Sequence, residues 1–145
     1  MNVVELIEDI TKRYIEKSGQ TMDVHTDYTE DDVENAGIFP IGDKKVDEDI
    51  LGNVTRQASI VMFHVLSGSE DCERIKSETF LINMAHEYDS IQEDEYNVDI
   101  GNGDNIKHGK LKNIACSNAM LYGRTSSTGY PVYQMNLLVT YKLYD

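Results

Sequence analysis

The chain has 145 residues, 40% of them hydrophobic and 27% charged, and a formal net charge of −13 at pH 7. This length suffices for a sizeable core, so we expect one domain over residues 1–145. No window approaches the ~18 consecutive apolar residues that cross a bilayer, which argues against a membrane protein. Acidic residues interrupt the first ten positions and argue against a secretory signal, so we expect the chain to stay in the cytoplasm where it is made.

The charge is distributed unevenly along the chain. Residues 1–106 hold 8 Lys or Arg against 25 Asp or Glu, whereas residues 107–145 hold 5 against 1. A free acidic surface repels nucleic acid and anionic lipid, and a basic edge that faces an acidic edge favours association in a set orientation. The alternative is that the surplus of acid only keeps a small protein soluble.

The first 28 residues predict a helix followed by a strand. Apolar residues recur at helical spacing from Val3 to Ile15, and Gly19 supplies a C-terminal stop. From Met22 to Tyr28 large side chains alternate with polar ones, which indicates a half-buried strand. We therefore expect an amphipathic helix that packs on a sheet.

Residues 29–52 show no clear periodicity and are rich in acids, glycine and proline. Two short apolar pieces, residues 37–41 and 46–51, are interpreted as edge strands or as the two arms of a protruding hairpin. A loop of this length inside a compact domain is usually functional or disordered. We favour a functional loop, and a solvated insertion is the alternative.

The central part of the chain predicts a strand and a second helix. Residues 54–66 carry apolar side chains on both faces of a strand, which implies cover on both sides, by helices or by another subunit. The helix is expected to begin after Ser69 and to run to about Ile91. Its expected apolar stripe consists of Cys72, Ile75, Thr79, Ile82 and His86, widened by Phe80, Leu81, Met84 and Tyr88.

The C-terminal third predicts a hairpin of two strands. Residues 111–122 form a strand of mixed pattern, and the Gly- and Ser-rich residues 123–129 connect it to a terminal strand with strict alternation. Strands in runs with two helices placed apart indicate an α+β fold. We expect a mostly antiparallel sheet of four to five strands, with both helices packed on it.

The sequence contains no constellation typical of catalysis or of a bound cofactor. The four histidines are scattered, none at the i, i+4 spacing that binds zinc on a helix, and we interpret His64 and His86 as structural residues with satisfied polar groups. Gly101 and Gly103 belong to no complete phosphate-binding motif. Cys72 and Cys116 have no metal-ligand spacing and are interpreted as reduced thiols. We expect no enzyme activity, no cofactor, no metal and no sequence-specific nucleic-acid binding.

The order of these segments resembles the tail-terminator proteins of long-tailed bacteriophages and prophages, some of which are labelled minor capsid proteins. The resemblance covers nearly the full chain and includes an N-terminal helix, a strand and a second helix. It also includes five short segments: Gly37-Ile38-Phe39-Pro40, Arg56-Gln57-Ala58-Ser59-Ile60-Val61-Met62-Phe63, Phe80-Leu81, Ser117-Asn118-Ala119 and Tyr133-Gln134-Met135-Asn136-Leu137-Leu138-Val139-Thr140-Tyr141.

The resemblance implies a structural role in virion assembly. Such proteins form a ring, typically of six subunits, that caps the tail tube, stops its polymerisation and provides the surface for head joining. The expected partners are other copies of the chain, the tail-tube protein and the head-tail connector protein, with DNA passing through the ring. The protein would be assembled in the host cytoplasm, possess no catalytic residues and end in the virion at the head-tail junction.

An acidic channel would let DNA pass without binding it. The candidate residues for lining the channel or contacting a partner belong to the acid-rich loop: Glu30, Asp31, Asp32, Glu34, Asp47, Glu48 and Asp49. A neck or head-tail connector protein is the close alternative function. From another class, an acidic inhibitor that mimics DNA would also fit a small α+β domain with this net charge.

Overall fold

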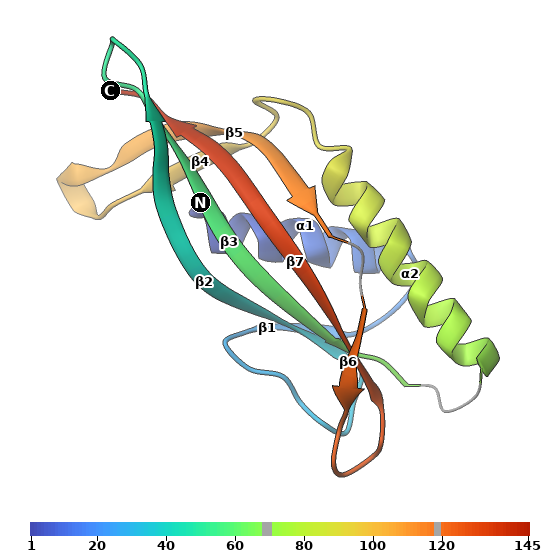
Figure 1. Ribbon diagram of the computed structural model, residues 1–145. Coiled ribbons are helices and arrows are strands. Elements are labelled where there is room, and N and C mark those ends of the chain that lie inside the picture. The colour runs from blue at the N-terminus through green and yellow to red at the C-terminus, as the bar shows by residue number, and fades with distance from the viewer. Residues whose placement is uncertain (68–70, 118–119) are drawn as a thin grey trace.

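The computed structural model describes residues 1–67, 71–117 and 120–145, in which the chain forms two helices and a mixed seven-stranded sheet (Figure 1). In chain order the elements are α1 (Val3–Lys17), β1 (Asp23–Thr26), β2 (Asn35–Glu48), β3 (Val54–Val65), α2 (Asp71–Asp89), β4 (Asn97–Ile100), a 3-10 turn (Gly103–Asn105), β5 (Lys107–Cys116), β6 (Met120–Arg124) and β7 (Pro131–Leu143). The expected α+β class is confirmed, but the expected count of four to five strands was wrong.

The sheet has the strand order β1-β2-β3-β7-β5-β4, and β6 also pairs with β7. Among the described strands only β1 and β2 run parallel, and every other pair of neighbours is antiparallel. Strand β7 therefore lies in the middle, with β3 along one edge and β5 and β6 in succession along the other. Its place explains its sequence, because a central strand with one buried face must alternate strictly.

The predicted alternation of buried and exposed side chains along β7 is confirmed. Its side chains are buried at every second position: Tyr133, Met135, Leu137, Val139, Tyr141 and Leu143. Partners on β3 continue the same face, since Ile60 pairs with Leu137 and Met62 pairs with Met135. These residues form one side of the hydrophobic core, which both helices cover.

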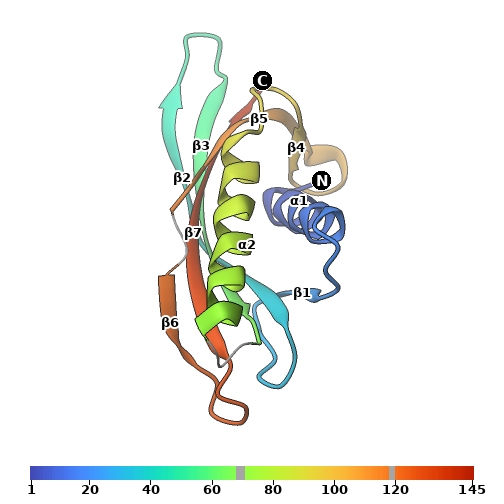
Figure 2. The same ribbon diagram turned by 90° about the vertical axis from the view of Figure 1, so that its right-hand side faces the viewer.

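Both helices lie on the same side of the sheet (Figure 2). Helix α1 contributes Leu6, Ile7 and Ile10 to the core and begins with a capping box in which Asn2 and Glu5 exchange side-chain-to-backbone hydrogen bonds. It ends in a Schellman-type turn at Gly19, whose φ of 80° suits glycine. The opposite face of the sheet has no helix on it in the described part of the chain.

The buried side of helix α2 differs from the expected stripe. Ile75 is 62% exposed and Ile82 is 45% exposed, and Thr79 and His86 are exposed as well. The helix instead buries the four residues that were expected only to widen this stripe, and Ala85 as well. They are Phe80, Leu81, Met84, Ala85 and Tyr88. The expected helix cap at Ser69 and the side chain of Cys72 lie outside the described residues.

The expected acid-rich loop is mostly a strand. Residues 35–48 form β2, which pairs with β3 along nearly its whole length and carries two bulge-like register shifts, after Pro40 and after Lys45. Strand β1 covers β2 only as far as Ile38, so Pro40 lies where the other edge of β2 is free and needs no donor there. The two short apolar pieces, residues 37–41 and 46–51, are not the two arms of one hairpin, because residues 37–41 and 46–48 lie on the same strand and the other arm is β3. The edge-strand interpretation is closer, since β2 beyond Ile38 pairs with β3 alone.

Two further corrections concern the C-terminal half. The expected strand over residues 111–122 is divided into β5 and β6, which pair with different parts of β7. Strand β4 was not expected as a strand, and it pairs with β5 at the far edge of the sheet. No helix in the described ranges is both long enough and apolar enough to cross a membrane.

Candidate functional site

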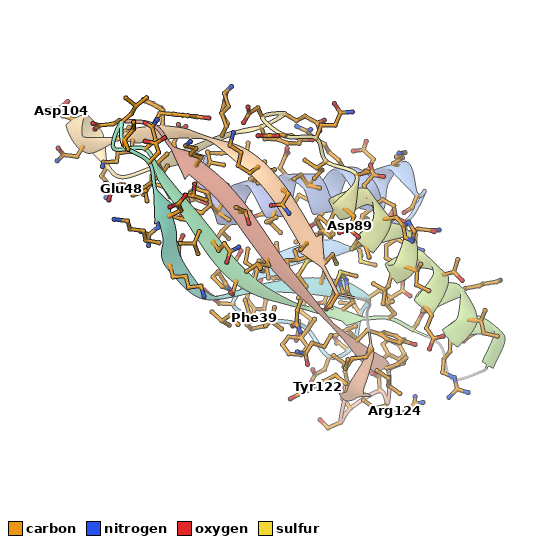
Figure 3. All side chains as sticks on the ribbon, turned by 45° about the horizontal axis from the view of Figure 1, so that its top comes forward. Phe39, Glu48, Asp89, Asp104, Tyr122 and Arg124 are labelled. Atoms are coloured by element: carbon orange, nitrogen blue, oxygen red, sulfur yellow. The ribbon has the colours of Figure 1, made fainter. Side chains whose placement is uncertain are left out.

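The seven acidic candidate residues do not form one group. Glu30, Asp31, Asp32 and Glu34 lie between β1 and β2, whereas Asp47, Glu48 and Asp49 lie at the tip of the β2–β3 hairpin. The 14 residues of β2 separate the two groups by roughly 43 Å at ~3.3 Å per residue. Figure 3 shows Glu48 at one end of the molecule and Tyr122 and Arg124, in β6, at the other. A single acidic patch on one protomer is therefore excluded.

At the β6 end, hydrogen bonds tie the loop between β1 and β2 to its neighbours. The buried Asn35 side chain accepts from the Glu30 backbone N–H at 3.0 Å and donates to the Glu30 carbonyl at 2.8 Å. Glu34 accepts from the backbone and hydroxyl of Ser67, and Thr128 donates to the Asp31 carbonyl at 2.8 Å. Hydrogen bonds therefore fix the conformation of this loop. The carboxylates of Asp31 and Asp32 are exposed and make no hydrogen bond in the described ranges.

At the hairpin tip, Asp49 has a structural role. Its carboxylate accepts from the backbone N–H groups of Leu51 and Asn53 and lies 3.1 Å from Lys142 Nζ. These bonds, above all the one from the Asn53 backbone, lower the pKa of Asp49 to about 2. Glu48 pairs with Lys45 at 2.6 Å, so Asp47 is the tip acid that has no ion pair among the described residues.

Two of the five cations in residues 107–145 are paired with acids of the same chain. Lys112 contacts Asp94 at 2.7 Å and Glu93 at 3.3 Å, and Lys142 contacts Asp49 at 3.1 Å. Strands β5 and β7 bring these cations beside acids from the first 106 residues. The opposite signs of the two sequence segments are therefore partly satisfied within one protomer, which weakens the idea of oppositely charged edges that join copies.

The face of the sheet opposite the helices carries a partly exposed apolar surface. Phe39, Phe63 and Tyr122 form an edge-to-face aromatic cluster, with ring centroids 5.4 Å and 5.1 Å apart. A shallow hollow of about 410 Å³ continues this surface over β5 and β7 and is lined by Ile41, Val61, Ala115 and Leu138 among others. We call the apolar residues named in this paragraph the open face. The two-sided pattern of residues 54–66 was its signal in the sequence.

A second cluster that the sequence analysis missed joins three neighbouring strands. Asp43 on β2 accepts from Arg56 Nε on β3 at 2.7 Å and from the hydroxyl of Tyr141 on β7. Burial is the main reason that the pKa of Tyr141 is raised, and the adjacent Asp43 adds to it. Each oxygen of Asp43 has a partner, so the cluster is a clamp that holds the hairpin to the sheet.

The histidines differ from the structural interpretation. His64 is fully buried, but neither of its ring nitrogens has a hydrogen-bond partner in the described part of the chain. Burial lowers its pKa to about 4. His86 is exposed on α2. Cys116 is a half-buried free thiol whose pKa is raised to about 12, mainly by burial, which makes it unreactive at neutral pH.

No protein-family model matches this chain, and no curated protein matches it either. The functional interpretation therefore depends on the surfaces described above. The open face is the surface on which the interpretation depends most, because the acids are divided between two ends and the polar clamp is internally satisfied.

Proposed function

We propose that this protein is a structural tail terminator of a phage or prophage, which assembles into a ring on the end of a tail tube. The ring stops tube polymerisation and presents the surface to which the head is joined. The role depends on association between copies and with the tube protein, not on turnover of a substrate. The open face is the observation that carries the proposal.

The open face is a suitable surface for burial between subunits. Leu138 is 36% exposed, Ile41 is 66% exposed and Tyr122 is 66% exposed, and each lies on a strand that is paired in the sheet. Aromatic and aliphatic side chains with partial exposure are typical of the buried centre of an interface. A sheet with helices on one side only leaves this surface for another chain to cover.

The two groups of acids support passage of DNA through such a ring. The carboxylates of Asp31, Asp32 and Asp47 have no ion pair among the described residues, and the chain as a whole carries −13. Like charge in a channel repels the phosphate backbone, so DNA would pass without adhering. The separation of the groups means that each end of β2 is a distinct candidate for the channel wall.

The proposal is tested by mixing the purified protein with tail-tube subunits and measuring tube length by electron microscopy. We expect the wild type to shorten tubes to a narrow length distribution and Leu138→Asp on the open face to lose this effect. Ile82→Asp on the exposed side of α2 is the matched control, since Ile82 is 45% exposed, and it should act as wild type.

Other results of this experiment would identify other functions. Unchanged tube length together with binding to the head would indicate a neck or head-tail connector protein. A monomer that leaves tubes unchanged and binds basic proteins in a salt-sensitive way would indicate the acidic inhibitor. Either result would contradict the proposed function as a tail terminator.

A further inference from the structure

We propose that Asp23, His25 and Glu30 form a binding site for a divalent transition-metal ion such as Zn²⁺. One nitrogen or oxygen from each of the three side chains lies within 4.8 Å of those of the other two. No other such group of three is found in the described ranges. The inference is independent of the proposed assembly role.

The backbone places these three side chains together. Asp23 and His25 are two residues apart on strand β1, so they point to the same face of the strand. The chain then turns at Asp27, whose φ is 67°, and the loop brings Glu30 back to the imidazole. Glu30 Oε2 lies 2.9 Å from His25 Nε2.

The site is held in place by contacts that do not involve a metal. The His25 ring stacks on Tyr28 with centroids 4.2 Å apart and an angle of 21° between planes. The Glu30 backbone is bound on both sides by the buried Asn35 side chain. Supporting contacts of this kind orient metal ligands and reduce the reorganisation that binding requires.

The donor set suits a transition metal better than Ca²⁺ or Mg²⁺. An imidazole with two carboxylates is a common set for Zn²⁺, with a further position left to water. The His25 side chain is 15% exposed and that of Glu30 is 43% exposed, so an ion has access from solvent. Calcium and magnesium prefer sites of oxygen alone, which the imidazole does not provide.

A bound ion would join β1 to the loop that precedes β2. This loop carries Asp31 and Asp32, so the ion would both fix the loop and offset part of its negative charge. No metal site was predicted from the sequence, because the four histidines show no i, i+4 pair of the kind that binds zinc on a helix. Here two ligands share a strand at i, i+2 and the third arrives from a loop.

The test is titration of the full chain with Co²⁺ followed by visible absorption, and with Zn²⁺ by calorimetry. Cys72→Ser and Cys116→Ser are present in every sample, so thiolate binding cannot imitate the site. We expect one ion per chain, and His25→Gln or Glu30→Gln should weaken binding by about tenfold or more. Circular dichroism checks that each variant is folded.

His108→Gln is the matched control, because His108 also pairs with a carboxylate, Asp99, at 2.7 Å but belongs to no such group of three among the residues that the structure describes. It should bind the metal as the parent does. Absence of binding to the folded parent protein, or binding that persists unchanged in His25→Gln, would overturn the proposal. Zn²⁺ and Mg²⁺ binding with equal affinity would also contradict it.

Discussion

His64 makes the stability of the protein depend on pH. Its pKa is about 4 in the folded chain, whereas an unfolded imidazole has a pKa near 6.5. The unfolded state therefore binds more protons between these values, and stability falls as pH falls through this window. The shift corresponds to about 3 kcal/mol of unfolding free energy, present above pH 6.5 and lost by about pH 4.

We expect His64→Leu to remove this part of the pH dependence, as measured by urea unfolding between pH 7 and pH 4. It also replaces two buried nitrogens that have no hydrogen-bond partner in the described residues by an apolar side chain. His86→Leu on the surface of α2 should keep the wild-type slope. Equal slopes for wild type and His64→Leu would show that the carboxylates alone cause the acid sensitivity.

At the scale of elements, the sequence predicts a strand or helix well where burial repeats with the period of the backbone. Strand β7 was predicted with its buried residues because one face is covered along its whole length. Strand β2 was predicted only as two short edge strands or hairpin arms, because its residues from Pro40 to Glu48 are all exposed and no alternation marks them. Residues 40–48 form a strand because they pair with β3, and the local sequence pattern does not reveal this pairing.

Local periodicity also failed to predict the buried side of helix α2 and most of the candidate site. Helix α2 carries its own apolar side chains on several sides, so periodicity could not decide which side faces the sheet. The open face was indicated by apolar residues on both sides of the segment over 54–66. Phe39 and Tyr122, which contact Phe63, lie in other segments of the chain, and no local pattern links them to it. The contact of Glu30 with His25 is likewise invisible to a search for repeating patterns.

Adjacent residues of α2 test its orientation. Leu81 is fully buried, whereas Ile82 is 45% exposed. We expect Leu81→Ala to lower the free energy of unfolding by about 2–5 kcal/mol, since it removes core contacts and leaves a cavity. Ile82→Ala should change it by about 0.5 kcal/mol. Chemical denaturation of both variants is the measurement, and similar losses would contradict the orientation.

Gly37 tests the contact between β2 and the loop that holds the acids. A Cβ at this position would lie 2.5 Å from the Tyr28 carbonyl oxygen, and Gly37 pairs with His25 on β1. We expect Gly37→Ala to destabilise the fold by roughly 1–3 kcal/mol through overpacking, and to displace the loop. Thermal or urea unfolding measures the loss.

Gly42→Ala is the control on the same strand, because nothing lies within 4 Å of its Cβ position. Its effect on unfolding should be small. A similar loss from both substitutions would mean that strand β2 as a whole, and not the approach of Tyr28, determines the cost.

At the scale of the whole molecule, charge and the open face have opposite effects on association. The net charge of −13 makes copies repel one another, whereas burial of the open face attracts them. Lys112 and Lys142 are paired with acids of their own chain, so they add little attraction between copies. An apolar interface between acidic subunits strengthens when salt screens the repulsion.

We therefore expect self-association to increase with salt, as measured by sedimentation velocity at ~0.1 M and ~1 M, where the Debye length falls from about 10 Å to about 3 Å. Leu138→Asp should remain monomeric at both salt concentrations, because it places a charge on the open face. Ile82→Asp adds the same charge on α2 and should associate as the wild type does. Association that weakens with salt would instead assign the interface to ion pairs between oppositely charged edges.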